Sequence, residues 1–330
     1  MIDSRGPIGI FDSGLGGLSV LRAVRALLPH EDIIYVADSG NAPYGERDDD
    51  FIVDRSLAIG EWLLAQHAKA IVVACNTATA QAVHLLRTVT PLPVVGVEPG
   101  LKPAATRSTS HVAGVLATSS TLRSEKFRRL LTEHQSRCRF LCQPGHGLVE
   151  AIERGDTASP ELVALLERYL APMLAEGADT LVLGCTHYPF IDAAIRGVVG
   201  ERMSIVDTSA AIAQQLTRLL AERQLTHPGD ASPDAPLIDS RDSRDSLDAP
   251  DTSGTLDALL NESPTAAPSR DSAFVSIEAS PRRPVIRLCT TGDATHLAHV
   301  ARTLLDLDEA VELLSIPSRR TSPGNSVASA

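Results

Sequence analysis

Two cysteines stand in similar contexts in distant parts of the chain. Cys75 lies in Ile71–Thr77 (IVVACNT) and Cys185 lies in Leu181–His187 (LVLGCTH), so that each follows an apolar run and precedes two polar residues. A thiol has an unperturbed pKa of about 8.5 and can act as an acid or a base near neutral pH. Inverting a carbon centre needs a base on one face and an acid on the other. The two cysteines therefore predict proton transfer across one carbon atom.

Polar residues near these cysteines are candidates for tuning the thiols and holding a substrate. His187 lies two residues after Cys185 and is predicted to relay or accept a proton. The carboxylates of Asp12 and Glu153 are predicted to partner a thiol or to bind a substrate ammonium group. We expect several such side chains to converge from strand ends, namely Asp12, Ser13, Asn76, Thr186 and His187.

The alternative is that each cysteine is a small buried hydrophobe, which is the usual environment of a lone cysteine at a strand end. Two cysteines in matching contexts, each followed by polar groups, weaken that alternative. Cys138, Cys142 and Cys289 lie in apolar, strand-like segments without this signature, and we predict that they are core residues.

The sequence predicts no metal ion and no organic cofactor at this site. The segment Cys185–His187 has no second Cys/His pair at a metal-ligand spacing. None of the three lysines lies in a Ser/Gly-rich loop at a strand end, where a Schiff base to pyridoxal phosphate would be expected. The string Gly14–Gly17 lacks both the phosphate-loop lysine and the GxGxxG spacing, so it predicts a tight turn that presents Asp12 and Ser13.

Apolar, β-branched runs alternate along the chain with amphipathic helical patterns. This alternation predicts βαβ units and mainly parallel sheets, in which polar residues directly after the strands line the ligand crevice. The expected strands are Ile8–Phe11, Ile33–Ala37, Ala70–Ala74, Val94–Val97, Val112–Ala117, Arg139–Cys142, Thr180–Gly184, Ser204–Val206 and Pro284–Cys289. The expected helices are Leu18–Leu28, Phe51–Gln66, Ala78–Val89, Ser124–Glu133, Glu161–Glu176, Ala210–Gln224 and Ala294–Leu307.

Composition and charge limit the class of protein. Of the 330 residues, 43% are hydrophobic but only 3% are aromatic, which predicts a core of Ala, Val, Leu and Ile. The formal net charge of −11 argues against a nucleic-acid surface, because phosphate binding needs clustered Lys and Arg. No run approaches about 18 apolar residues, and five cysteines without an export signal are typical of reduced thiols. We expect a cytoplasmic protein that neither spans a membrane nor binds nucleic acid directly.

A long polar segment at 224–283 interrupts the pattern. It is rich in Ser, Asp and Pro, and its acidic residues outnumber the basic ones about two to one. Such a segment cannot bury enough apolar surface to offset its chain entropy, so we predict that this insertion is disordered. We predict the same for the tail at 318–330. Long surface insertions add little closure entropy, and deletion of residues 228–282 is therefore expected to leave activity intact.

Five motifs together resemble those of the glutamate racemases of the aspartate/glutamate racemase superfamily. They occur in the family's order and are GIFDSGLGGLSVL (9–21), YVADSGNAPYGER (35–47), VVACNTATA (72–80), GVEPGLKPA (96–104) and LGCTHYPF (183–190). The resemblance covers about residues 7–223 and 284–307. It implies a cofactor-independent interconversion of L- and D-glutamate, which would supply D-glutamate for peptidoglycan and thereby serve cell-wall biogenesis and cell shape.

The resemblance also implies roles for individual residues. Cys75 and Cys185 would be the proton donor and acceptor, with opposite roles for the two enantiomers. In the family an acidic residue before a Gly assists the thiols, and Glu153 fits that position best, with nearby Glu150 as the alternative. The substrate would be bound by Asp12, Ser13, Tyr44, Gly45, Asn76, Thr77, Thr186 and His187.

The family fold consists of two doubly wound α/β domains with mainly parallel sheets. They are related by pseudo-twofold symmetry, and the active site lies in the cleft between them. By this resemblance the first domain would comprise residues 1–97, 207–223 and 284–317, and the second would comprise 98–206. Family members are often dimers, so a homodimer is a possible assembly here. The insertion at 224–283 departs from the family, whose ordinary members have a short connection there.

Three other functions are compatible with parts of this pattern. A racemase of aspartate or another amino acid would share the scaffold, because the contacts that set substrate length are not evident in the sequence. A one-cysteine lyase or hydrolase would keep one thiol and replace the other, whereas both positions are Cys here. A non-catalytic protein that binds a partner such as a topoisomerase would show no turnover.

Overall fold

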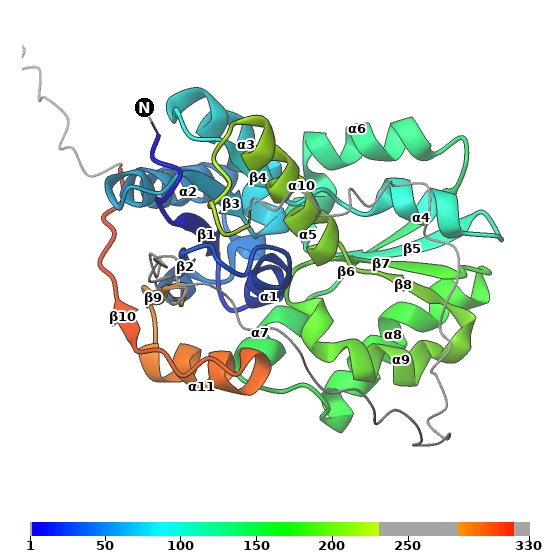
Figure 1. Ribbon diagram of the computed structural model, residues 1–330. Coiled ribbons are helices and arrows are strands. Elements are labelled where there is room, and N and C mark those ends of the chain that lie inside the picture. The colour runs from blue at the N-terminus through cyan, green and yellow to red at the C-terminus, as the bar shows by residue number, and fades with distance from the viewer. Residues whose placement is uncertain (1, 231–282, 320–330) are drawn as a thin grey trace, which may run out of the picture. The chain divides into compact units, whose positions relative to one another are not determined.

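Strands alternate with helices along the chain and form two sheets (Figure 1). This arrangement is seen in a computed structural model that describes residues 2–230 and 283–319. Every strand pair in these ranges is parallel. The predicted α/β fold with two parallel sheets is thereby confirmed.

The larger sheet has the strand order β10-β9-β2-β1-β3-β4. Its strands are β1 (Ile8–Asp12), β2 (Ile33–Ala37), β3 (Ala70–Val73), β4 (Val94–Gly96), β9 (Ile286–Thr290) and β10 (Val311–Leu313). The smaller sheet has the order β6-β5-β7-β8. Its strands are β5 (Val112–Ala117), β6 (Arg139–Pro144), β7 (Thr180–Gly184) and β8 (Ser204–Val206).

The two sheets repeat one strand order. In each of them the first strand lies between the second and the third, and the fourth follows the third: β2-β1-β3-β4 in one sheet and β6-β5-β7-β8 in the other. The third strands, β3 and β7, are the two that lead into Cys75 and Cys185. The likeness between the two cysteine segments therefore extends to their position in the fold.

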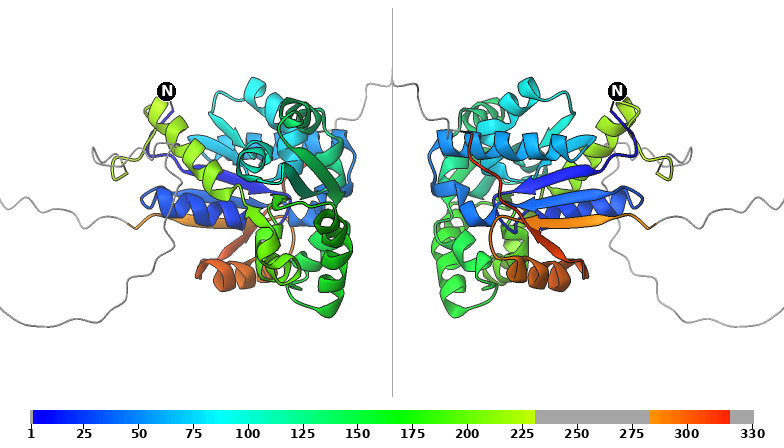
Figure 2. Two further views of the ribbon diagram at one scale, coloured as in Figure 1. Left: turned by 90° about the vertical axis from the view of Figure 1, so that its right-hand side faces the viewer. Right: turned by 90° about the vertical axis from the view of Figure 1, so that its left-hand side faces the viewer.

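Helices cover both faces of each sheet (Figures 1 and 2). The longer helices are α1 (Leu18–Leu27), α2 (Asp49–Ala65), α3 (Asn76–Val89), α6 (Glu125–His134), α8 (Pro160–Ala175), α9 (Asp192–Val199), α10 (Ser209–Glu222) and α11 (Ala294–Leu305). In the larger sheet, α1, α10 and α11 pack on one face while α2 and α3 pack on the other. Such two-sided burial explains why the strands are continuous apolar runs.

Several elements were not predicted from the sequence. They are the short strand β10 and the short helices α4 (Leu101–Arg107), α5 (Ser119–Arg123) and α7 (Leu148–Glu153), together with α9 and single 3₁₀ turns such as η2 (Tyr44–Glu46). Elements of one or two turns carry too few residues to display a helical period. Three of them, α5, α7 and η2, contribute residues to the site described below.

Residues 224–230 were predicted to belong to the disordered insertion, but they have defined contacts and that part of the prediction is wrong. Leu225 is buried against the larger sheet, the backbone N–H of His227 donates to Glu31, and Asp230 pairs with His30. Most of the predicted insertion, residues 231–282, lies outside the described residues, as does most of the predicted tail, residues 320–330. At the start of that tail, the backbone N–H of Arg319 donates to Asp54.

The three cysteines that were predicted to be core residues differ in exposure. Cys138 and Cys289 are buried, as predicted. Cys142 is exposed, so its predicted core position is wrong. It lies on β6, which is an edge strand of the smaller sheet and is covered less completely than the central strands.

Within residues 2–230 and 283–319, none of the helices combines the length and the apolar character needed to span a bilayer.

Candidate active site

The two strand-end cysteines line one cavity. Cys75 follows β3 and is the N-cap residue of α3, and Cys185 follows β7. Both are nearly buried, with 4% and 6% of their surface exposed. Because the strands of each sheet are parallel, their carboxyl ends lie at one edge, and the loops at these edges surround the cavity.

Most of the residues predicted for the site lie at this cavity. The predicted residues that line it are Ser13, Tyr44, Gly45, Cys75, Asn76, Thr77, Cys185, Thr186 and His187. Asp12 and Glu153 do not line it but lie directly behind it, in contact with residues that do. The structure therefore brings all of the predicted site residues into one neighbourhood, as lining residues or as their direct partners.

Cys75 lies in a buried and partly anionic environment. Its sulfur accepts a hydrogen bond from the backbone N–H of Ala78 at 3.4 Å and lies 3.6 Å from the hydroxyl of Ser13. Burial raises the pKa of the Cys75 thiol, and the nearby charge of Asp12 raises it further. Cys75 is therefore protonated at neutral pH.

Asp12 ends β1 beneath this thiol and is fully buried. Its carboxylate accepts hydrogen bonds from the backbone N–H of Gly17 at 2.6 Å and from the Thr186 hydroxyl at 3.4 Å. Burial raises the pKa of Asp12, while the charge of His187 and the hydrogen bond from Gly17 oppose the shift. Asp12 thus links the turn after β1 to the segment that carries the second cysteine.

Cys185 has a different partner. Its sulfur lies 3.7 Å from Nδ1 of His187, and Nε2 of the same ring lies 2.5 Å from a carboxylate oxygen of Glu153. Burial by itself would lower the pKa of His187, but its contacts with Cys185 and Glu153 raise it well above the ordinary value. An imidazolium can donate from both ring nitrogens, which suits a position between a sulfur atom and a carboxylate.

Glu153 is held in place by two further contacts. Its carboxylate accepts from the backbone N–H of Leu15 at 2.8 Å, and its backbone carbonyl accepts from His296 on α11 at 2.6 Å. Burial would raise the pKa of Glu153, but the hydrogen bond and charge of His187 lower it below the ordinary value. The neighbouring Glu150 lines the cavity instead.

The glycine string after β1 forms a turn against these groups. A Cβ atom on Gly16 would lie 2.5 Å from Nδ1 of His187 and 2.6 Å from the hydroxyl oxygen of Thr186. A Cβ atom on Gly14 would clash with the Glu153 carboxylate. Only glycine leaves room for the side chains that arrive from the other sheet.

The cavity offers neutral hydrogen-bond donors for an anionic ligand. Asn76 begins α3, and within the described residues its buried side-chain nitrogen has no hydrogen-bond partner. The amino-terminal end of a helix attracts negative charge, so Asn76 and its helix end are suited to a carboxylate. Of the described residues that line the cavity, none is Lys or Arg.

Sequence reasoning missed several lining residues. Thr118 and Ser119 follow β5, and the hydroxyls of Thr118 and Thr77 lie 2.9 Å apart across the two sheets. The others are Pro43, Glu46, Gly145, His146, Gly147 and Val149, whereas Glu150 was named only as an alternative to Glu153. The strand-end rule, had it been applied to Val112–Ala117 and Arg139–Cys142, would have indicated Thr118 and Ser119 and the neighbourhood of Gly145.

A larger cavity, of about 780 Å³, contains none of the predicted site residues. Its basic lining side chains are Arg87, Lys126, Arg129, Arg218 and Arg223. It has no thiol and no histidine, so size alone does not identify the chemical site. In the described part of the chain, no group of three or more His, Cys, Asp or Glu side chains is arranged to hold a metal ion.

Comparison with known proteins gives a consistent result. The family described as Asp/Glu/Hydantoin racemase matches residues 18–216. A glutamate racemase of Ralstonia nicotianae is 60% identical over 229 residues, which are 69% of this chain and 83% of the relative.

Solved structures resemble the fold along most of its length. A glutamate racemase isoform of Bacillus anthracis superimposes with a TM-score of 0.73 at 25% identity and covers 96% of this chain and 100% of that one. Escherichia coli glutamate racemase, in complex with L-glutamate and the activator UDP-MurNAc-ala, gives a TM-score of 0.61 at 36% identity. That match covers 66% of this chain and 83% of the other.

Proposed function

This chain belongs to the Asp/Glu/Hydantoin racemase family, and we propose that it interconverts L- and D-glutamate without a cofactor by proton transfer between Cys75 and Cys185. The observation that carries the proposal is that two buried thiols reach one cavity from equivalent strand ends of two similarly ordered sheets. Glutamate as the substrate is supported by the glutamate racemase of Ralstonia nicotianae, which is 60% identical to this chain over 229 residues.

The surroundings of the two thiols favour different roles for them. His187 carries a proton 3.7 Å from the sulfur of Cys185 and can stabilise negative charge there, so we assign Cys185 as the base. Cys75 remains a thiol, because burial and Asp12 disfavour its anion, and it serves as the acid. The resting enzyme is thus prepared for one direction of the reaction.

The reaction then exchanges the roles of the thiols. The Cys185 thiolate takes the α-proton, and the electron pair of the broken C–H bond is delocalised into the α-carboxylate. Cys75 gives its proton to the opposite face of the carbon, which inverts the centre and leaves a Cys75 thiolate and a Cys185 thiol. The reverse direction starts from this second state, so that the enzyme has to pass protons between the thiols or turn over the other enantiomer.

Binding of the substrate carboxylates is assigned to neutral donors. Asn76 contributes the unpartnered side-chain nitrogen and the helix end, while Ser13, Thr77 and Thr186 contribute hydroxyls. Preorganised donors of this kind also stabilise the charge that develops on the α-carboxylate. Tyr44 and Gly45 complete the wall of the cavity on the side of η2.

We further propose that the two sheets mark two domains. The first comprises residues 1–97, 207–223 and 284–317, and the second comprises 98–206. The buried core supports this division, because α10 packs with α1 and α11 in the first of them. We also propose that the protein is a homodimer, which light scattering tests. We propose that it works in the cytoplasm, where D-glutamate would enter peptidoglycan synthesis. Rescue of a D-glutamate auxotroph tests this supply of D-glutamate.

The proposed activity is tested by α-proton exchange. Purified protein, free of pyridoxal phosphate, is incubated with D-glutamate in heavy water, and optical rotation and the α-proton NMR signal are followed. We expect inversion with entry of deuterium at the α-carbon. Cys75→Ala and Cys185→Ala should each lose about a thousandfold or more of the rate, since each removes an acid–base group.

Cys142→Ala is the matched control, because Cys142 is exposed on an edge strand, and it should retain the wild-type rate. Exchange with aspartate but not with glutamate would keep the mechanism and change the substrate. If either Cys75→Ala or Cys185→Ala remained active, a one-cysteine lyase or hydrolase would be favoured. If no amino acid exchanged its α-proton, a non-catalytic binding protein would be favoured.

A further inference from the structure

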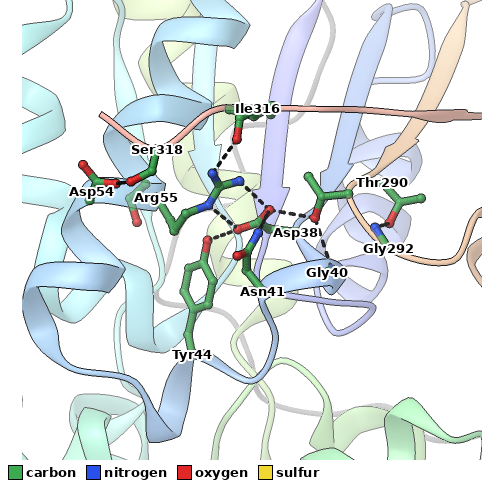
Figure 3. Close-up of polar contacts among 12 residues, drawn as sticks. Asp38, Gly40, Asn41, Tyr44, Asp54, Arg55, Thr290, Gly292, Ile316 and Ser318 are labelled. Carbon is green, nitrogen blue, oxygen red and sulfur yellow. Dashed lines mark hydrogen bonds and ion pairs between the residues drawn. The ribbon is translucent and has the colours of Figure 1, made fainter. Parts of the chain in front are cut away.

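A buried ion pair lies behind the wall of the cavity and was not predicted from the sequence. Asp38 directly follows β2, and Arg55 lies on α2. The carboxylate of Asp38 is fully buried and accepts from the Arg55 guanidinium at two points, 3.0 Å from Nε and 2.8 Å from Nη2 (Figure 3). Such a two-point contact fixes both orientation and distance.

The Asp38 carboxylate also contacts residues in the wall of the cavity. The hydroxyl of Tyr44 donates to Asp38 at 2.5 Å, and the side chain of Asn41 donates to it at 3.0 Å (Figure 3). Tyr44 is 1% exposed, and burial together with the Asp38 charge raises the pKa of its hydroxyl well above the ordinary value. The hydroxyl therefore keeps its proton and stays directed at Asp38, while Tyr44 and Gly45 line the cavity.

The wall also fits closely against the second sheet. A Cβ atom on Gly45 would lie 3.0 Å from Cβ of Thr118, which is itself a lining residue and hydrogen-bonds Thr77. A small displacement of the segment that contains Tyr44 and Gly45 would therefore change the width of the cavity between the two sheets.

Residues that follow the polar insertion in the sequence complete the network. The third nitrogen of Arg55, Nη1, donates to the backbone carbonyl of Ile316 at 2.6 Å, and the hydroxyl of Thr291 donates to Asp38 at 2.8 Å. Asp38 and Arg55 thus join the end of β2, the helix α2 and the last described segment of the chain (Figure 3).

We infer that Asp38 and Arg55 are positioning residues, which hold the Tyr44–Gly45 segment at the distance from Thr118 that substrate binding requires. Neither residue lines the cavity, so both act through Tyr44. This inference rests on the proposed function, since it concerns the binding of glutamate at the same site.

The test separates substrate binding from folding. Asp38→Asn removes the charge that Tyr44 and Arg55 contact, and Arg55→Lys keeps a charge but loses the two-point geometry. KM and kcat for D-glutamate are measured together with Tm, and the Kd for D-glutamate is measured by titration calorimetry. We expect each variant to raise KM and Kd about tenfold or more, because a displaced binding group loses its alignment.

A second buried ion pair supplies the matched control. Glu31 and Lys69 pair with 1% and 0% of their side chains exposed, but they lie at the opposite ends of their strands, before β2 and before β3. Glu31→Gln should lower Tm and leave KM within about twofold of wild type, since partial unfolding reduces the active fraction and not the affinity.

The outcomes separate the two proposals. A lower Tm with unchanged KM and Kd in Asp38→Asn or Arg55→Lys would overturn the positioning role and leave a purely structural one. If Asp38→Asn does not fold, Arg55→Lys decides the question. A wild-type protein that binds D-glutamate without turnover would contradict the proposed function, and the calorimetric Kd would still test the positioning role.

Discussion

At the scale of single residues, the site contains one residue type in two environments. Cys75 faces a buried carboxylate, whereas Cys185 faces a histidine that is itself paired with a carboxylate. The first environment disfavours the anion of Cys75, and the second places a protonated histidine beside the sulfur of Cys185. In the proposed mechanism an acid and a base thereby arise from identical side chains, and their difference depends on partners that only the fold supplies.

This asymmetry predicts a pH effect for Glu153→Gln. The carboxylate of Glu153 helps to hold the pKa of His187 up, and an amide would not, so His187 should lose its proton at lower pH. The alkaline limb of kcat/KM should therefore move to lower pH, and kcat should fall about tenfold or more. Rate profiles between pH 6 and 10 measure both effects.

Glu167→Gln provides the comparison, because Glu167 is an exposed residue on α8. Its profile should coincide with that of the wild type. An unchanged alkaline limb in Glu153→Gln would show that this carboxylate does not control the proton on His187.

At the scale of elements, the strands deliver the thiols and the turns make space for their partners. The turn between β1 and α1 passes so close to His187 and Thr186 that only glycine fits at position 16. The order of strands is equally important, since Cys75 and Cys185 both follow the third strand of their sheets. The path of the backbone therefore sets the positions of the two thiols and of their partners.

Gly16→Ala tests this close approach. The added methyl group would displace His187 or Thr186, and we expect kcat/KM to fall about a hundredfold, because small misplacements in an active site have effects of that size. Circular dichroism should remain that of the wild type. Gly197→Ala on α9, where a Cβ atom meets nothing within 4 Å, is the control and should keep full activity. Equal activity of both variants would remove the steric argument.

At the scale of the whole molecule, a long polar insertion separates two parts of one sheet. Its ends lie near each other, because Asp230 contacts His30 while the backbone N–H of Val285 donates to Asp32 at 2.7 Å. His30 and Asp32 are two residues apart, so a short connection can replace the insertion. The chain after it contributes β9 to the sheet and His296 and Ile316 to contacts near the site.

We expect deletion of residues 232–282, with a short Gly/Ser linker in their place, to keep kcat/KM within about twofold of wild type, since closing a short loop costs little entropy. The deletion begins at residue 232 and not at 228, so that the contact between Asp230 and His30 is kept. A matched deletion from residue 225 would also remove the buried Leu225, and it should lower Tm. Loss of activity in the folded 232–282 deletion would assign a function to the insertion.

The sequence alone determined the class of the fold and the place of the chemistry along the chain. Strands buried on both faces need continuous apolar runs, and ligand-binding residues of parallel sheets follow those runs directly. Cys75, Asn76, Cys185 and His187 could therefore be recognised from local context. The motifs of the family carried the resemblance, which the comparisons confirmed.

Tertiary structure alone decided which of these residues meet and what their neighbours do to them. The contact of Glu153 with His187, and the network of Asp38, Arg55 and Ile316, join segments that lie far apart in sequence. No local pattern encodes such contacts, and helices as short as α7 show no clear period. The pKa shifts of Cys75 and His187 follow from burial and from nearby charges, which exist only once the chain has folded.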